Sequence, residues 1–278
     1  MKPSSKLLAI LAILLFAFAA TAQIDPASSQ SELHLGVEAY KNSHFEEAIE
    51  HFEKAVNLDA SNLKARLYLA TTYVSQFIPG VNSPVNLQAA EKAIEQYQHV
   101  LDFSEDRNSK INSAKGIAYL YLNTKKFDDA KKYYQIAIDL DPEDPEPHYS
   151  IGVIDWTECY APRMETRAKL GVKPNENLNP ENEDQKKACD ELRVKSKAAL
   201  EEGIASLNKA IELRPDYDDA MAYMNLMYRE KADVECDDLA ARAEDLKTAD
   251  AWVDKVMAIK KAKAEKQQSL RPQPNQQQ

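Results

Sequence analysis

Residues 111–142, INSAKGIAYLYLNTKKFDDAKKYYQIAIDLDP, contain the pattern that decides the fold of this chain. The pattern is carried by small, aromatic and proline residues, namely Ile117, Ala118, Tyr121, Phe127, Ala130, Tyr134, Ala137 and Pro142. Small residues at two fixed positions let two helices approach closely, and aromatic residues fill the gap between successive helix pairs. A proline at the end stands where a helix must stop. The stretch therefore predicts a helical hairpin.

Four further stretches repeat parts of the same pattern on both sides of this one. Their matching residues are Leu35, Gly36, Phe45, Ala48, Phe52 and Ala55; Leu69, Ala70, Tyr73, Ala93, Tyr97 and Val100; Ile151, Gly152, Gly203, Leu207, Ala210 and Pro215; and Met224, Asn225 and Tyr228. No long stretch alternates with a period of two, so we expect no strands. Internal repetition of a helical hairpin is typical of a solenoid.

The spacings resemble those of the tetratricopeptide repeat family over roughly residues 32–258. The resemblance implies an all-α, right-handed superhelical solenoid of about five helical hairpins, each covering an apolar face of the one before it. The family repeats every 34 residues. The spacing between the equivalent small residues Ala48 and Ala93 exceeds this period by 11 residues, and the spacing between Ala130 and Gly203 exceeds it by 39. We therefore place insertions at about 77–86 and 157–195, and expect the second to add a contact surface or to shield one end of the groove.

Residues 1–22 have the pattern of a secretory signal peptide. Lys2 and Lys6 precede an apolar run of 12 residues, 7–18, and Ala20-Thr21-Ala22 forms a small-x-small cleavage site. An uncleaved N-terminal anchor is the alternative. We expect an exported protein of bacterial type, periplasmic or secreted, with no membrane span after cleavage. A flexible segment, 23–31, is expected before the repeat domain, 32–264, and a disordered glutamine-rich tail, 265–278, after it.

Composition excludes several function classes. The 278 residues carry a net charge of -10, which disfavours binding to the phosphate backbone of a nucleic acid. Only 6 glycines are present, too few for a typical Rossmann or P-loop domain. A mean hydropathy of -0.55 excludes a polytopic membrane protein. No catalytic or metal-binding motif occurs; Glu47 and His51 could share a metal, but surface pairing explains them better. We expect no cofactor, no metal and no enzymatic activity.

The 3 cysteines leave at least one thiol unpaired within a monomer. If the long insertion simply lengthens the fourth hairpin, Cys189 lies about 16 Å further out than Cys159, beyond the reach of a disulfide. Cys236 follows the neighbouring first helix of a hairpin. This reasoning favours a disulfide between Cys159 and Cys236, with three free thiols as the rival.

The resemblance also implies which side chains line the inner groove, since the family uses fixed positions of each first helix. These positions are held by Tyr40, Lys41, Tyr68, Thr71, Tyr119, Asn123, Tyr149, Val153, Trp156, Tyr223 and Arg229. A row of Tyr and Trp offers a large contact area at low side-chain entropy. Extended peptides are the natural ligands of such a groove, although several of these rings could instead only pack between hairpins.

The sequence therefore predicts a non-enzymatic interaction scaffold that binds a protein or peptide in its concave groove. An alternative is an accessory subunit in envelope assembly or polymer handling, in which the aromatic row holds a glycan. A third is an enzyme with an unrecognised site. The sequence does not identify the partner, the pathway or the oligomeric state.

Overall fold

The computed structural model describes residues 24–173 and 176–269. In these ranges every regular element is a helix, and no strand occurs. The helices are α1 (Pro26–Lys41), α2 (Phe45–Leu58), α3 (Leu63–Gln76), α4 (Pro84–Phe103), α5 (Arg107–Asn123), α6 (Phe127–Leu140), α7 (Pro145–Lys169), α8 (Glu183–Leu213), α9 (Asp218–Val234) and α10 (Leu239–Ser269). The predicted all-α class is confirmed.

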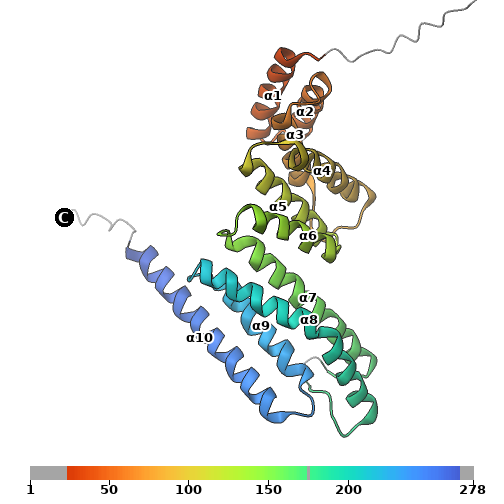
Figure 1. Ribbon diagram of the computed structural model, residues 1–278, viewed down its shortest axis with the longest axis vertical. Helices are drawn as coiled ribbons and strands as arrows, with labels where there is room; N and C mark the ends of the chain where they lie inside the picture. Colours follow the sequence, from red (N-terminus) through yellow and green to blue (C-terminus); the bar gives the residue numbers. More distant parts are fainter. Residues whose placement is uncertain (1–23, 174–175, 270–278) are drawn as a thin grey trace, which may run out of the picture.

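Consecutive helices pair as hairpins, and consecutive hairpins stack. Each helix packs mainly on its neighbours in sequence, and α3 also contacts α5 while α7 contacts α9. Figure 1 shows the pairs following one another along the long axis, from α1 and α2 at one end to α9 and α10 at the other. The described residues form a helical solenoid of five hairpins, as the repeat pattern predicts.

Small residues allow the two helices of a hairpin to touch. A Cβ atom added to Gly36 in α1 would lie 2.5 Å from the Phe52 ring of α2, and one added to Gly152 in α7 would lie 2.5 Å from Leu207 of α8. Phe52 is fully buried by this contact. The same small and large positions that reveal the repeat in the sequence therefore form the hairpin interfaces.

Side-chain caps begin many of the helices. Each capping side chain accepts a hydrogen bond from a backbone N–H in the first turn of its helix, which has no partner within the helix. The capping residues are Asp25, Asn62, Ser83, Asp106, Asp144 and Asn182. The starts of these six helices are thus encoded locally, whereas α2, α6 and α9 begin without a side-chain cap.

The long insertion lengthens both helices of the fourth hairpin. The first of them, α7, continues through Pro162 to Lys169. Two arginines in the added turns, Arg163 and Arg167, pair with Asp233 near the end of α9. These pairs hold the added turns of α7 against the fifth hairpin, so this part of the insertion extends the stack.

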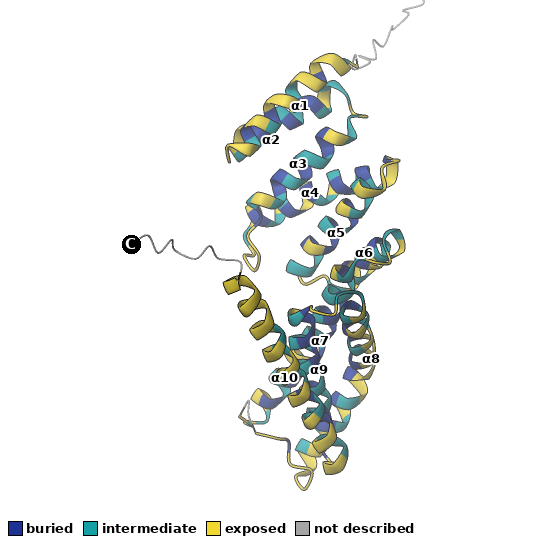
Figure 2. Cartoon of the chain, turned by 90° about the vertical axis from the view of Figure 1, so that its left-hand side faces the viewer, coloured by how far each residue is buried: buried dark blue, intermediate teal, exposed yellow. Residues whose placement is uncertain are grey.

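Two predicted domain boundaries are wrong. Residues 26–31, expected to be flexible, form the first turns of α1, because Asp25 caps the helix and the buried Ser29 hydroxyl donates to the Ala55 carbonyl at 2.8 Å. Residues 265–269, assigned to the tail, continue α10. The outer face of α10 is largely exposed (Figure 2).

The predicted signal peptide, 1–22, lies outside the described residues, as do residues 270–278 of the tail. Within the ranges that the structure describes, no helix combines the length and the apolar character needed to cross a membrane.

The predicted disulfide between Cys159 and Cys236 is wrong. The structure joins Cys189 to Cys236, with Cα atoms 6.4 Å apart, and leaves Cys159 as a buried free thiol. Burial raises the pKa of the Cys159 thiol to about 12, which disfavours the reactive thiolate.

The alignment of α9 with α7 explains the error. Glu230 of α9 bonds to Arg163 of α7, so the two residues lie at the same height along these neighbouring helices. Arg163 comes one helical turn after Cys159 in α7. Cys236 comes after Glu230, in the turn between α9 and α10. It therefore lies past Cys159, at the level where the lengthened α8 places Cys189, and only the three-dimensional offset between hairpins reveals this.

Candidate binding groove

The predicted groove residues all fall on the first helices of the five hairpins. Tyr40 and Lys41 end α1, Tyr68 and Thr71 lie in α3, Tyr119 and Asn123 in α5, Tyr149, Val153 and Trp156 in α7, and Tyr223 and Arg229 in α9. Their side chains do not form one continuous row. They divide into two groups, one near each end of the solenoid, with a few residues that belong to neither.

The first group lines a hollow of about 660 Å³, called here the N-terminal hollow. It lies between α1, α3 and α5, and Tyr97 of α4 also lines it. Its lining residues are Tyr40, Leu63, Lys64, Leu67, Tyr68, Thr71, Tyr97, Ser104, Ser109 and Asn112. Three of the predicted residues, Tyr40, Tyr68 and Thr71, thus share one concave surface.

Hydroxyl groups and one cation dominate the chemistry of the N-terminal hollow. Tyr97 and Thr71 share a hydrogen bond of 3.2 Å, and the Tyr40 hydroxyl lies 3.3 Å from Ser75 Oγ. Burial raises the pKa of Tyr97, so its hydroxyl is protonated at neutral pH. Of the described residues that line the hollow, Lys64 alone carries a charge. The surface offers donors and ring faces in a chain whose net charge is -10.

Sequence reasoning missed part of this hollow. Tyr97 was recognised only as the aromatic residue of a second helix, although it reaches through to the inner side. Ser109 and Asn112 lie in the first turns of α5. Asn112 stands six residues before Ala118, and Lys64 of the same hollow stands six residues before Ala70, so the repeat register gives both the same groove position. This register could have found Asn112 and Lys64, whereas it marks nothing at Ser109.

The second group is a run of five aromatic rings, called here the aromatic ladder. Ring centroids are 5.0 Å apart for Tyr217 and Tyr149, 5.6 Å for Tyr149 and Tyr223, 5.5 Å for Tyr223 and Trp156, and 4.8 Å for Trp156 and Tyr160. Such distances are typical of favourable edge-to-face and offset-stacked pairs. Tyr149, Trp156 and Tyr223 were predicted, whereas Tyr217 and Tyr160 were not.

An arginine lies over the ring at each end of the ladder. Arg214 is 4.3 Å from the Tyr217 centroid, and Arg163 is 5.3 Å from that of Tyr160. These cation–π contacts fix the outer rings in place.

The ladder is partly core and partly surface. Tyr217 is buried and Tyr160 is 37% exposed, with the other three rings between them. Burial, helped by Tyr223 and nearby carboxylates, raises the pKa of Tyr149 to about 12, so its hydroxyl remains a donor. The buried indole N–H of Trp156 has no hydrogen-bond partner among the described residues. The rings therefore pack between the fourth and fifth hairpins and, apart from the buried Tyr217, are partly exposed.

The remaining predicted residues are not brought into either group. Tyr119 packs edge-on against Phe77 at 6.5 Å, and the Asn123 amide donates back to the Tyr119 carbonyl at 2.8 Å. Lys41 is exposed and Val153 is half-buried. Arg229 bonds to Asp250 of α10 at 2.7 Å, so its charge is used within the fifth hairpin.

A charge cluster around the buried Asp155 joins the third and fourth hairpins. Lys131 of α6 bonds to Asp155 and Glu158 of α7 and to Glu202 of α8, at 2.9 Å for Glu158 and 3.1 Å for Glu202. Asp155 is fully buried, and its second oxygen has no hydrogen-bond partner in the described ranges. Burial outweighs the attraction of Lys131 and raises the pKa of Asp155 to about 7. The cluster ties three helices together at one lysine.

Replacing Asp155 by asparagine should change the pH dependence of stability. The pKa of Asp155 in the folded protein lies above its ordinary value of 3.8. The stability that Asp155 contributes is therefore full below about pH 4 and is lost as pH rises through about 7. We expect the stability of the wild type to fall by on the order of 3 kcal/mol relative to Asp155→Asn across this interval. Urea unfolding at pH 4.5, 6 and 8 measures the difference. Asp254→Asn on exposed α10 is the control, and a pH-independent difference for Asp155→Asn would contradict the expectation.

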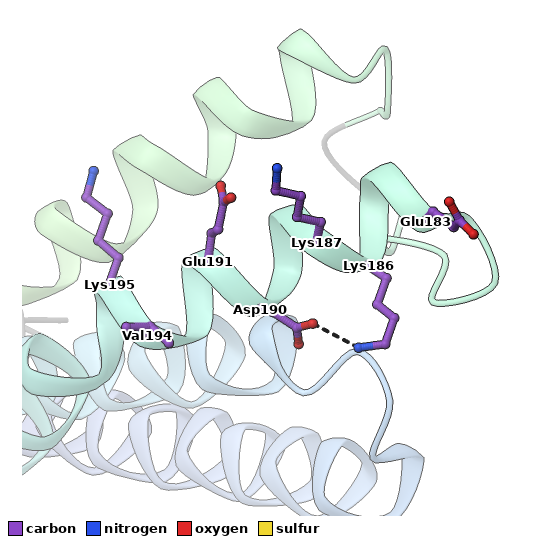
Figure 3. A pocket seen from close by; sticks show the side chains of 7 residues that line it. All are labelled: Glu183, Lys186, Lys187, Asp190, Glu191, Val194 and Lys195. Carbon is purple, nitrogen blue, oxygen red and sulfur yellow. Dashed lines mark hydrogen bonds and ion pairs between the residues drawn. The ribbon is translucent and has the colours of Figure 1, made fainter.

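Another hollow, of about 630 Å³, runs along the outer face of α8 (Figure 3). Its lining residues all come from this one helix, and they are Glu183, Lys186, Lys187, Asp190, Glu191, Val194 and Lys195. Lys186 and Asp190 pair at 2.8 Å, and charges of both signs alternate along the face. With a single helix contributing, the side chains do not converge on a ligand, and we interpret this face as solvated surface.

The histidine considered as a metal ligand is paired otherwise. His51 lies 2.7 Å from Glu32 of α1, while Glu47 lies 3.3 Å from His44. Among the described residues, no group of three or more His, Cys, Asp or Glu side chains is arranged to hold a metal ion.

Comparison with known proteins agrees with this architecture. Residues 33–62 and 116–144 match the tetratricopeptide repeat family, so the first and third hairpins carry recognisable repeats. A segment of 110 residues, 40% of this chain, is 32% identical to the protein STIP1 homolog of Dictyostelium discoideum. The chain spans only 18% of the length of that curated relative.

Solved structures of repeat proteins share the fold. A crystal structure of the MamA protein superposes with a TM-score of 0.56 at 16% identity, covering 89% of this chain and 98% of MamA. A structure of MamA from Desulfovibrio magneticus RS-1 superposes with a TM-score of 0.55 at 14% identity, and the match covers 85% of this chain and 97% of the MamA chain. YrrB is described as a TPR protein with an unusual peptide-binding site. It superposes with a TM-score of 0.51 at 15% identity, and the match covers 86% of this chain and 92% of the YrrB chain. At these identities the likeness establishes the tetratricopeptide-type solenoid fold and nothing finer.

Proposed function

We propose that this chain is a non-enzymatic scaffold that binds an extended peptide, or an extended segment of a protein, along its inner groove. The observation that carries the proposal is the N-terminal hollow, in which groove residues of three successive hairpins converge on about 660 Å³. Ring faces supply contact area, and Lys64 with the hydroxyls supplies the few polar groups that orient a chain. The peptide-binding site named for YrrB, which shares the fold, supports the same ligand class.

A displayed library of random peptides, selected on the immobilised protein, tests this proposal. We expect peptides that bind saturably and that lose at least tenfold in affinity when Lys64→Glu and Asn112→Asp are combined, because both changes put negative charge in the hollow. The control is Lys261→Glu, on an exposed turn of α10. A library that yields no saturable binder, or binders indifferent to the hollow variants, would overturn the proposal.

A glycan-binding role is the second candidate, because aromatic rings can also stack on sugar rings. The aromatic ladder is the observation that favours it. A glycan array separates the two roles, since a groove that reads peptides should retain no saccharide, whereas saccharide binding lost on Tyr160→Ala would favour the second.

The scaffold is proposed to act outside the cytoplasm, in the periplasm or as a secreted protein. The pattern of residues 1–22 supports export, and the Cys189–Cys236 disulfide suits an oxidising compartment. Cell fractionation with N-terminal sequencing tests this. A mature chain that begins near Gln23 in the exported fraction is expected, and an unprocessed cytoplasmic chain would contradict it.

A further inference from the structure

The last helix of the stack, α10, has a side that no described helix covers. In the earlier hairpins the second helix packs on its own partner and also on the first helix of the next hairpin, as α8 does on α7 and α9. In the part of the chain that the structure describes, α10 packs mainly on α9, and no further hairpin follows it. Figure 2, viewed from the side of α10, shows this helix uncovered in front of α9. A side that stacking would bury is therefore open at this end of the solenoid.

Apolar residues form a stripe along α10, called here the outer stripe. Its positions are spaced alternately by four and three residues, which is the spacing of a coiled-coil seam. The residues at these positions are Leu239, Ala243, Leu246, Asp250, Val253, Met257, Lys260 and Ala264. Leu239 is 73% exposed, Met257 64% and Val253 40%. Exposed apolar side chains at this spacing are typical of a helix that packs on a partner helix.

The outer stripe differs from the side that holds α10 on α9. That inner side carries Ala249, which is fully buried, and Trp252, which packs on the core of the last two hairpins. Asp245 on the same side bonds to Lys231 of α9 at 2.7 Å. Residues of the outer stripe directly follow these three in the sequence, so the two sides lie about 100° apart round the helix. Packing within the fifth hairpin therefore does not account for the exposed stripe.

The charges of α10 suit an antiparallel partner of the same sequence. The exposed charges of the first half, 239–254, are Glu244, Lys247, Asp250 and Asp254, and those of the second half, 255–269, are Lys255, Lys260, Lys261, Lys263, Glu265 and Lys266. Two parallel copies would bring like charges together, whereas two antiparallel copies bring each acidic half against a basic half. The helix dipole favours the same order of charges in a single helix, but it does not require an apolar stripe.

We propose that α10 pairs through the outer stripe with α10 of a second copy of this chain, in antiparallel orientation and about a two-fold axis. In the register that brings the whole stripe together, Leu246 faces Met257 of the second copy, and the axis passes near Val253. A two-fold interface is self-complementary, so the same stripe serves both copies. The contact extends over about 37 Å of helix, from Leu239 to Ala264.

The charged residues beside the stripe fit this register. Lys247 lies next to Asp254 of the second copy, and the two-fold symmetry forms this pair twice. Within its own chain, Lys247 makes only an exposed contact of 3.6 Å with Glu244, which little energy opposes breaking. The flanking charges therefore favour the antiparallel orientation.

Two charged residues lie within the stripe itself. Asp250 is bonded to Arg229 at 2.7 Å, so its charge is balanced within its own chain. Lys260 lies level with Ala243 of the second copy, a small residue over which the aliphatic stem of the lysine can extend. Neither residue therefore buries an unpaired charge in the dimer.

A dimer joined through α10 holds two grooves, one in each copy. A partner with two binding segments then engages both, and the second contact gains from the effective concentration that the first supplies. The dimer goes beyond the proposed function and does not depend on it.

Sedimentation equilibrium of the purified chain tests the proposal. We expect a monomer–dimer equilibrium with a dissociation constant in the micromolar range, as for a small transient interface. Met257→Glu should weaken dimerisation at least tenfold, because the interface would bury a charge without a partner. The control is Ala262→Glu, the same added charge at an exposed position about 140° round the helix from Met257, and it should change the constant less than twofold.

Circular dichroism checks that both variants keep the helical fold. A chain that is monomeric at about 100 µM would overturn the proposal. A dimer that is indifferent to Met257→Glu would also do so, because its interface would lie elsewhere.

Exchange of the flanking charges tests the register. Lys247→Asp should weaken dimerisation about fivefold, because it sets two aspartates against each other on both sides of the axis, and Asp254→Lys should do the same with two lysines. The variant that combines both changes restores opposite charges and should recover most of the affinity. A combined variant that dimerises as weakly as the single ones would overturn the proposed pairing.

Crosslinking tests the orientation. Val253→Cys, near the axis, should be joined into a covalent dimer by a short bismaleimide. Leu239→Cys should not, because the two copies of this residue lie about 37 Å apart in antiparallel helices. The introduced thiol is the exposed one, since Cys159 is buried and the other two cysteines form the disulfide. Crosslinking through Leu239→Cys would indicate parallel helices and overturn the inference.

None of these measurements uses a ligand, so their failure leaves the proposed function untouched. Failure of the library selection likewise leaves the dimer testable.

Discussion

Replacement of Glu230 by alanine is expected to lower the free energy of unfolding by about 3–5 kcal/mol. Glu230 is 4% exposed, and its two oxygens accept from Arg163 Nε at 2.6 Å and Nη2 at 2.7 Å. Arg163 also pairs with Asp233 at 3.1 Å. Removing the carboxylate leaves the buried guanidinium with Asp233 as its remaining partner. The loss of two charge-assisted hydrogen bonds destabilises the contact between the fourth and fifth hairpins.

Denaturant unfolding followed by circular dichroism measures the loss. Glu201→Ala, which removes an exposed carboxylate of α8, should cost less than about 0.5 kcal/mol. Pairing Glu230→Leu with Arg163→Met should recover most of the loss, because an apolar pair of similar volume needs no desolvation of charge. If the double variant were as unstable as Glu230→Ala, the loss of stability would come from altered packing and not from the hydrogen bonds that Arg163 loses.

Loss of the disulfide is the second large effect. Cys189 and Cys236 are 47 residues apart in sequence, and a loop of that length stabilises a fold by about 4 kcal/mol in the chain-entropy description. We expect Cys236→Ser to lower the free energy of unfolding by that order. The bond joins α8 to the turn after α9, so the loss should appear in the fourth and fifth hairpins.

Reduction distinguishes the observed pairing from the one that the sequence suggested. The wild type should lose stability in dithiothreitol, and Cys236→Ser should be insensitive to it. Cys159→Ser should keep the sensitivity of the wild type, because Cys159 is a free thiol. A Cys159→Ser variant that no longer responds to reductant would show that Cys159, and not Cys189, is bonded to Cys236.

Much of the fold is readable from local patterns. Gly36 with Phe52, and Gly152 with Leu207, stand at the repeat positions that bring paired helices together, and the structure puts each pair in contact. Capping side chains such as Asp106 mark helix starts without reference to any distant residue. These features repeat because each hairpin faces the same packing problem as the next.

The candidate site was only half predictable. Tyr68 and Thr71 were found because the repeat positions mark the inner face of a first helix. Tyr217 was missed because it lies in a turn before α9, where the pattern marks nothing, and Tyr160 because it belongs to the turns that the insertion adds to α7. Arg229 holds a marked position, yet the neighbouring Asp250 takes up its charge.

The amino-acid sequence by itself determined that this protein is a stack of helical hairpins, since periodicity, caps and close-contact residues act over a few turns of chain. Only the tertiary structure decided that Cys236 meets Cys189, that the insertion is tied to α9 through arginines, and that rings from α7 and α9 form one ladder. The reason is physical. These contacts depend on how far one hairpin is shifted along the next, and that offset results from all side chains packing at once.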